Sequence, residues 1–225
     1  TVTLTVASSE ALKSLSVGGG EGEPTPFNPV GDSGLEWTVS RTVESGENGE
    51  SGFTLNYEDL AGNDGASVSN TTNSSDLSFD TTLPTLSSVT LASSNAATNR
   101  AKSGDSLTLV FSSSEPISVL TVTLAGTSVT ATNASGNGTD WQAVHTVDSS
   151  TPSDAVAFRT SFADAAGNTG TVESTTDSSS VAVDLEAPTL TKVEVSSSNA
   201  NTQGRLEQLA KAGDTVTLTV ASSEA

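Results

Sequence analysis

The stretch Thr1-Val-Thr-Leu-Thr-Val-Ala-Ser-Ser-Glu-Ala11 alternates apolar side chains with threonines and then ends on a Ser-Glu step. Such alternation places the apolar side chains on one face of a β-strand, which is typical of a strand that covers a core on one side. The stretch returns unchanged from Thr215 to Ala225, and a diverged copy, SLTLVFSSSE, runs from Ser106 to Glu115. One strand used three times in a single chain indicates a tandem repeat.

Other landmarks recur in the same order, 104 or 105 residues apart, except for the Lys-x-Gly-Asp turn, whose two copies are 109 residues apart. The pairs are Trp37 with Trp141, Asp59-Leu-Ala-Gly-Asn63 with Asp164-Ala-Ala-Gly-Asn168, Asp80-Thr-Thr-Leu-Pro84 with Asp184-Leu-Glu-Ala-Pro188, and Lys102–Asp105 with Lys211–Asp214. Proline fixes the backbone and cannot donate to a ladder, so the Asp-x-x-x-Pro segment fits a linker or a strand edge. We therefore predict a complete domain over 81–184, a domain lacking its first strand over 1–80, and the first strands of a third domain over 185–225.

Within 81–184 the apolar periods are those of short strands, and we count about seven of them, including a short one near Ser128–Thr132. Seven short strands in a domain of this length are typical of an immunoglobulin-like sandwich. We therefore predict an all-β fold made of tandem immunoglobulin-like β-sandwich domains, with about seven strands each. The expected core of the complete domain is formed by Leu109, Phe111, Trp141, Phe158 and Val183.

The composition argues against several classes of partner. The 225 residues include no Cys, so disulfides cannot hold the fold, and 27 acidic against 8 basic residues give a formal charge of −19. A polyanion repels nucleic acid and anionic membranes, so neither is an expected partner. We find no apolar run of membrane-spanning length and no signal peptide. Because Thr1 opens inside a strand pattern, we expect the chain to be a piece of a longer protein whose targeting signals lie outside it.

The Asp-x-x-x-Pro linker, the Lys-x-Gly-Asp turn, the Ser-Glu strand end, the Trp and the Asp-x-Ala-Gly-Asn loop together resemble known repeats. They are similar to the bacterial immunoglobulin-like domains that form tandem stalks in giant surface adhesins, and the resemblance covers the whole chain. An extracellular filament built from such repeats also fits the identical ends. The resemblance implies an extracellular or cell-surface location, adjacent copies as end-to-end partners, and calcium at domain junctions. Lateral self-association is left open.

The expected topology brings acidic residues far apart in sequence to one junction. In an immunoglobulin-like sandwich the second and sixth strands return to the pole where the chain enters. The second strand carries Glu115 there, the sixth carries the loop Asp164–Asn168, and the linker brings Asp80. Calcium takes roughly six to eight oxygen ligands, and these carboxylates with carbonyls of the Gly-Asn turn supply most of them. We therefore predict a calcium site at Asp80, Glu115, Asp164 and Asn168.

The repeat places equivalent residues at the other junctions. These residues are Glu10, Asp59 and Asn63 in the first domain, and Asp184 and Glu224 at the third. Each of these two sets lacks a partner, so only the set around Asp80 is expected to be complete. Under the alternative interpretation Asp164 and Asn168 merely shape a turn, since Asp, Gly and Asn favour such conformations, and the other carboxylates are solvated.

Catalysis is not expected. Gly31-Asp-Ser-Gly34 and Gly104-Asp-Ser-Leu107 look like protease and esterase nucleophile segments, but the first domain has no His to act as a base. The second motif reads Gly213-Asp-Thr-Val216 in the next repeat, as expected of a turn that opens a strand. The single His, His145, takes the place of Arg41 in the repeat, which favours an outer face. The recurring Trp is expected in the core rather than on a sugar-binding surface.

Four Asn-x-Ser/Thr sequons occur, at Asn70, Asn73, Asn133 and Asn137, all in expected exposed loops. They are candidate glycosylation sites in a eukaryotic secreted protein and accidental in a bacterial one. The leading interpretation of the chain is a structural, non-catalytic module of an extracellular stalk or filament, rigidified by calcium at its junctions. The alternative is a ligand-binding adhesin module that contacts carbohydrate, ice or protein.

Overall fold

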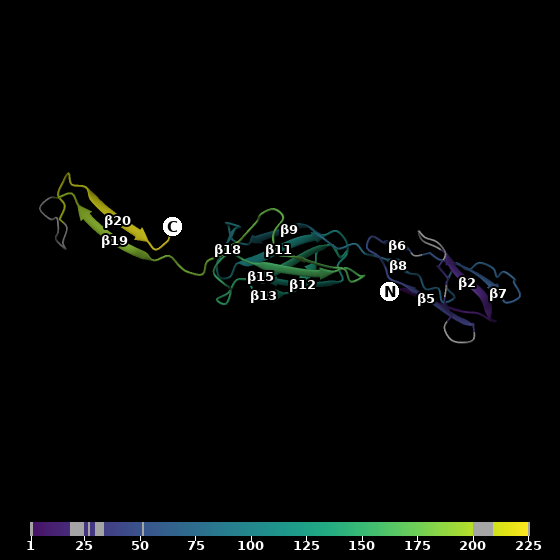
Figure 1. The fold of residues 1–225 in the computed structure, drawn as a ribbon. Coiled ribbons are helices and arrows are strands. Elements are labelled where there is room, and N and C mark those ends of the chain that lie inside the picture. The colour runs from purple at the N-terminus through teal and green to yellow at the C-terminus, as the bar shows by residue number, and fades with distance from the viewer. Residues whose placement is uncertain are drawn as a thin grey trace.

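The structure is a computed structural model that describes residues 2–18, 25–26, 28–29, 34–50, 52–199 and 209–224. Every regular element over these residues is a β-strand, which confirms the all-β prediction. No helix of membrane-spanning length and hydropathy occurs among them. Figure 1 shows three parts that follow one another along the chain: strands β1 to β8, a sandwich of β9 to β18, and a hairpin of β19 and β20.

The sandwich packs two four-stranded antiparallel sheets, with the orders β14-β15-β11-β9 and β13-β12-β16-β17, and β10 pairs with β18 in a short parallel ladder. Its strands are β9 (Leu86–Ser93), β10 (Arg100–Ala101), β11 (Ser106–Ser113), β12 (Val119–Leu124), β13 (Thr127–Val129), β14 (Ala131–Asn133), β15 (Asp140–Thr146), β16 (Phe158–Ala163), β17 (Thr169–Val172) and β18 (Ala182–Val183). The sequence predicted one short strand near Ser128–Thr132. The chain instead crosses between the sheets there, so that β13 lies on one sheet and β14 on the other.

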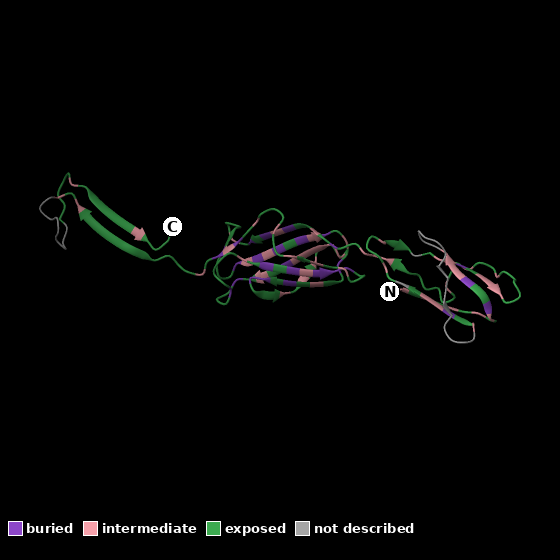
Figure 2. Cartoon of the chain, in the orientation of Figure 1, coloured by how far each residue is buried: buried purple, intermediate pink, exposed green. Residues whose placement is uncertain are grey.

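The core of the sandwich follows the predicted alternation. Leu107, Leu109 and Phe111 of β11 are fully buried, and the opposite sheet contributes Leu124 and Phe158 to the same cluster. Of the expected core residues, Trp141 is half-buried and packs against this cluster, and Val183 belongs to it. Figure 2 shows buried residues concentrated in this part of the chain. The alternation therefore builds a core as predicted, because each strand turns one face inward.

The two tryptophans occupy equivalent places. The indole nitrogen of Trp141 donates a hydrogen bond to the carbonyl of Gly138 at 3.0 Å, and that of Trp37 donates to the carbonyl of Gly34 at 2.9 Å. Trp37 is buried in the core of the first part. A buried indole needs a partner for its polar edge, and the loop before the strand supplies it in both repeats. These contacts support the core interpretation of the Trp pair.

The first part has smaller sheets, in the orders β1-β5-β4, β3-β2-β7 and β6-β8. Its strands are β1 (Val2–Ala7), β2 (Leu12–Gly18), β3 (Thr25–Pro26), β4 (Asn28–Pro29), β5 (Glu36–Arg41), β6 (Gly49–Glu50), β7 (Thr54–Asp59) and β8 (Ser78–Phe79). Strand β1 pairs with β5 alone among the described residues, whereas its counterpart β11 is flanked by β15 and β9. The inward side chains of β1 are consequently half-buried, where those of β11 are buried.

The C-terminal hairpin pairs β19 (Leu190–Ser197) with β20 (Val216–Ser222) and exposes an apolar face. Five side chains of this face are 51–65% exposed: Val193, Val195, Val216, Leu218 and Val220. Their counterparts in β9 and β11 are the fully buried centre of the sandwich. The hairpin is thus one half of a sheet whose apolar face has no cover among the described residues (Figure 2).

Candidate metal centre

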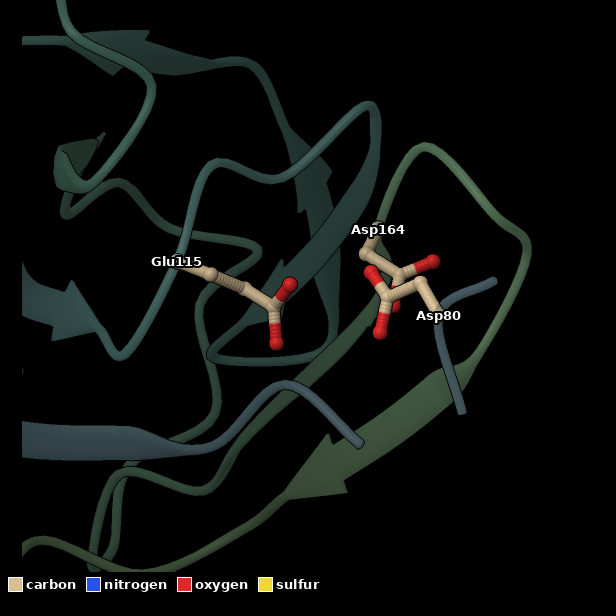
Figure 3. Close-up of side chains that lie close together, drawn as sticks. All are labelled: Asp80, Glu115 and Asp164. Atoms are coloured by element: carbon tan, nitrogen blue, oxygen red, sulfur yellow. The ribbon is translucent and has the colours of Figure 1, made fainter. Parts of the chain in front are cut away.

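Three carboxylates from distant segments meet where the first part joins the sandwich. Asp80 follows β8, Glu115 follows β11 and Asp164 follows β16. One carboxylate oxygen from each lies within 4.8 Å of the others. Figure 3 shows Asp80 and Asp164 next to each other, with the Glu115 side chain extending toward them. Two oxygens that both lie about 2.3–2.6 Å from one calcium ion are at most about 5.2 Å apart, so the spacing fits a shared ion.

The Asp164 loop is a turn built on its own carboxylate. Asp164 is 2% exposed, and its Oδ1 accepts hydrogen bonds from the backbone N–H groups of Gly167 at 2.7 Å and Asn168 at 2.9 Å. Its Oδ2 accepts one from the Asn168 side chain at 2.8 Å. Burial contributes most and raises the pKa of Asp164, but the bonds from Asn168 and the loop together outweigh it and lower that pKa. Asp59 and Asn63 form the same turn in the first part. The turn-shaping role therefore holds, and Oδ2, which accepts one of these bonds, keeps a lone pair for a cation.

The pKa of the Glu115 carboxyl reflects both its burial and its two acidic neighbours. Burial raises the pKa of its carboxyl, and the nearby charges of Asp80 and Asp164 raise it further. A raised carboxyl pKa means that the folded protein disfavours the ionised form. The cluster is therefore repulsive when all three groups are ionised, and a divalent cation would remove that repulsion.

The linker is hydrogen-bonded from both sides of the junction. The Asn168 side chain donates to the carbonyl of Asp80 at 3.1 Å. On the other side, the backbone N–H of Thr81 donates to the Asn48 side chain at 2.9 Å, and the Thr82 hydroxyl donates to the same oxygen at 3.1 Å. An open hollow beside Asp80 is lined by Asn48 and Phe79 of the first part and by Ser114 and Glu115 of the sandwich. An ion held by the three carboxylates would be open to water from this hollow, and water would then complete its coordination.

The equivalent residues at the other junctions are not brought into such a group. Among the described residues, the set around Asp80 is the one group of three acidic ligands close enough to share an ion. Glu10 and Glu224 end the same Ser-x-Glu turn as Glu115, with a serine hydroxyl donating to the Glu carbonyl each time. Asp184 accepts the backbone N–H of Glu186 at 3.0 Å, as Asp80 accepts that of Thr82. The local turns are thus repeated. The junction at Asp80 differs because the linker, the Ser-x-Glu turn and the Asp164 loop are all found together there among the described residues.

Asn48 is the junction residue that sequence reasoning missed. Its side chain accepts from two linker residues, yet it sits in a loop and belongs to none of the motifs that recur along the chain. The repeat could not indicate it, because the position about 104 residues later is Pro152, which lacks an amide side chain. A linker contact of this kind depends on the loop conformation rather than on a residue pattern.

The motif at Gly104, which looks like a nucleophile segment, forms an ordinary turn. Gly104 has a φ of 88°, and the Asp105 side chain accepts the backbone N–H of Lys102, so this segment is a turn that opens β11. His145 is half-buried, and its Nε2 lies 3.1 Å from the Thr151 hydroxyl. Gly31 to Ser33 of the other motif lie outside the described residues.

The sequons differ in accessibility. Asn70, Asn73 and Asn137 are exposed, as expected for loops. Asn133 is not in the loop: it is the last residue of β14, pairs with Trp141 and is half-buried. The strand β14 thus extends one residue further than predicted, and the side-chain oxygen of Asn133 accepts the backbone N–H of Gly136 at 2.9 Å.

Comparison with known proteins gives distant likenesses. No family model matches the chain, and no curated protein does. BcpA, the major pilin subunit of Bacillus cereus, shares 9% identity at a TM-score of 0.24, over 87% of this chain and 70% of that chain. SGBP-B of a Bacteroides ovatus mixed-linkage glucan utilization locus, in complex with a mixed-linkage heptasaccharide, shares 16% at a TM-score of 0.20, over 86% and 43%. Likenesses at these TM-scores carry no argument about function. The class is therefore defined by the fold itself, an all-β protein of sandwich architecture.

Proposed function

We propose that the chain is a structural, non-catalytic repeat module of an extracellular stalk or filament, in which calcium stiffens the domain junction. The observation that carries the proposal is the convergence of Asp80, Glu115 and Asp164, one from the linker and two from the sandwich. An ion held by all three would tie the linker to the next unit. The resemblance of the repeated motifs to adhesin stalk domains supports the extracellular location and end-to-end copies as partners.

The arrangement of the linker also favours a spacer. Inter-domain interfaces within one chain are usually small and mobile. Here the linker is held by Asn168 on one side and Asn48 on the other, in addition to the acidic cluster. A cation at Asp80 would act on a junction whose geometry is already restricted, so little ordering would oppose binding.

Titration of calcium chloride into calcium-free protein tests the proposal. We expect isothermal titration calorimetry to report one site, and thermal denaturation to shift upward with calcium because the ion binds the assembled junction. Glu115→Gln should abolish both signals, since it removes one charged ligand and keeps the side-chain shape. Glu224→Gln is the matched control, because Glu224 ends the same turn outside the acidic group.

Two results would contradict the calcium part of the proposal. One is the absence of any calcium-dependent heat or melting shift in the wild-type chain. The other is an equal response in Glu115→Gln and wild type, which would place the ion elsewhere. Either result would leave a spacer whose junction is held by hydrogen bonds alone.

A further inference from the structure

The loop residue Asn48 lies at the junction, and the linker binds its side chain. The backbone N–H of Thr81 donates to its side-chain oxygen at 2.9 Å, and the Thr82 hydroxyl donates to the same oxygen at 3.1 Å. Asn48 is exposed and lines the same open hollow as Asp80 and Glu115. Two donors on one carbonyl oxygen draw electrons from the side-chain carbon, which makes that carbon easier for a nucleophile to attack.

The residue after Asn48 places a nucleophile next to this carbon. It is Gly49, and glycine has no Cβ to hinder the approach of its own backbone nitrogen. Gly49 is exposed, has a φ of 98°, and a Cβ added there would meet no atom within 4 Å. It begins the ladder of β6 with β8, which are 2 residues long each, so this peptide can open locally at little cost.

The sandwich contains the other Asn-Gly pair of the chain, Asn137-Gly138, and holds its glycine in place. The Gly138 carbonyl accepts the backbone N–H of Ile117 at 3.0 Å and the indole N–H of Trp141 at 3.0 Å. A Cβ added at Gly138 would lie 3.1 Å from the side chain of Pro116, so the peptide has little room to turn. The Asn137 side-chain oxygen also accepts two hydrogen bonds, here from its own loop. The two pairs therefore differ mainly in the freedom of the glycine.

We infer that Asn48 is a site of spontaneous conversion to aspartate or isoaspartate, and that the fold protects Asn137 from the same reaction. The Gly49 nitrogen bonds to the side-chain carbon of Asn48, the bond from that carbon to Nδ2 breaks, and ammonia leaves with the proton of the Gly49 N–H. Thr81 and Thr82 stabilise the side-chain oxygen while it carries negative charge. Water then opens the cyclic succinimide. Opening at the side-chain carbonyl gives aspartate, and opening at the backbone carbonyl gives isoaspartate.

Either product replaces a neutral amide at the junction with a carboxylate. In the aspartate form the side-chain oxygen keeps Thr81 and Thr82 as donors, and their bonds become charge-assisted. In the isoaspartate form the main chain is longer by one backbone atom, so the loop no longer fits the linker in the same way. Both forms add negative charge beside the group of Asp80, Glu115 and Asp164. The aspartate form should therefore bind calcium more tightly, and this consequence alone rests on the proposed function.

Incubation of the full chain in mildly alkaline buffer, followed by peptide mapping with mass spectrometry, tests the inference. We expect the mass gain of an amide-to-acid change several-fold faster at Asn48 than at Asn137. In urea the two rates should become similar, because the fold no longer holds Gly138. Similar rates in the folded protein, or faster conversion at Asn137, would overturn the inference.

A pair of threonine variants tests the part that the linker plays. Thr82→Val removes the hydroxyl that donates to Asn48. Thr123→Val is the matched control, because it removes an exposed hydroxyl at the end of β12 that lies away from Asp164. We expect conversion at Asn48 to slow several-fold in Thr82→Val alone. An unchanged rate in that variant would overturn the role of the linker donors.

The Asn48→Asp variant is the aspartate product made directly, and it distinguishes this inference from the calcium proposal. Isothermal titration with calcium chloride should show tighter binding in Asn48→Asp than in the wild-type chain. Equal or weaker binding in the variant would contradict the effect of the added carboxylate. If neither protein binds calcium, the calcium proposal fails, whereas conversion at Asn48 is still decided by the mass measurement.

Discussion

The side chain of Asn168 donates hydrogen bonds to the carbonyl oxygen of Asp80 at 3.1 Å and to the carboxylate of Asp164 at 2.8 Å. One amide group therefore links the linker from the first part to the acidic loop of the sandwich. Asn63 is its counterpart in the first part and, among the residues that the structure describes, makes the second type of bond alone, to Asp59. A comparison of these two asparagines therefore distinguishes the bond that closes the turn from the bond that holds the linker.

Asn168→Ala should loosen the junction, whereas Asn63→Ala should not. Both variants lose the side-chain bond that closes the turn, so both should melt at a slightly lower temperature. Only Asn168→Ala also loses the bond to Asp80. Distances between spin labels placed on the two sides of the linker would show a broader distribution in that variant alone. Equal broadening in both would mean that Asn168 acts through the turn rather than through the linker.

Calcium removal should increase the range of angles between the first part and the sandwich without unfolding either one. The ion would link Asp80 to two residues of the sandwich, while each core is formed by apolar side chains that the ion does not touch. Small-angle scattering with calcium and with a chelator measures the change in maximum dimension, and circular dichroism checks that the strands remain. An unchanged scattering profile would show that hydrogen bonds alone set the angle.

The calcium-free protein should lose stability through Glu115 as the pH rises. The pKa of this carboxyl is raised above its ordinary value of 4.5, first by burial and then by Asp80 and Asp164. Between the unfolded and folded pKa values the folded protein binds more protons, so the free energy of unfolding falls as pH increases. Below 4.5 the unfavourable contribution disappears. Glu115→Gln should therefore melt close to wild type in acid and above it at neutral pH in calcium-free buffer, while Glu224→Gln shows no such divergence.

Leu109 and Leu218 occupy equivalent strand positions in different environments. Leu109 is fully buried and Leu218 is 65% exposed. Leu109→Ala should cost about 2–5 kcal/mol of unfolding free energy, because it leaves a cavity in the sandwich core. Leu218→Ala should cost under about 0.5 kcal/mol, as is usual for surface changes. Urea denaturation of dilute, monomeric protein distinguishes the two. A large loss in Leu218→Ala would mean that the hairpin face is already covered.

Sequence periodicity predicted the β-rich fold and the core well, because alternation decides which side chains share a face. The alternation of Leu107, Leu109 and Phe111, for example, needs no tertiary information. The crossing between sheets near Thr130 was missed, because one short apolar stretch does not reveal where the chain changes partner. The acidic group was anticipated from topology, since Asp80, Glu115 and Asp164 follow segments that reach one pole. The contact of Asn48 with the linker depends on a loop that does not recur.

The positions of the two linkers determine how the sandwich responds to tension. Strand β9 begins shortly after one linker and β18 ends just before the next, and Figure 1 shows the chain entering and leaving at opposite ends. A pull along the chain therefore runs parallel to β9, while its hydrogen bonds to β11 lie across the strand direction. Such a load acts in shear on the whole ladder at once instead of opening one bond after another. The orientation of its strands in this way lets a unit without a single disulfide resist a pull along the chain.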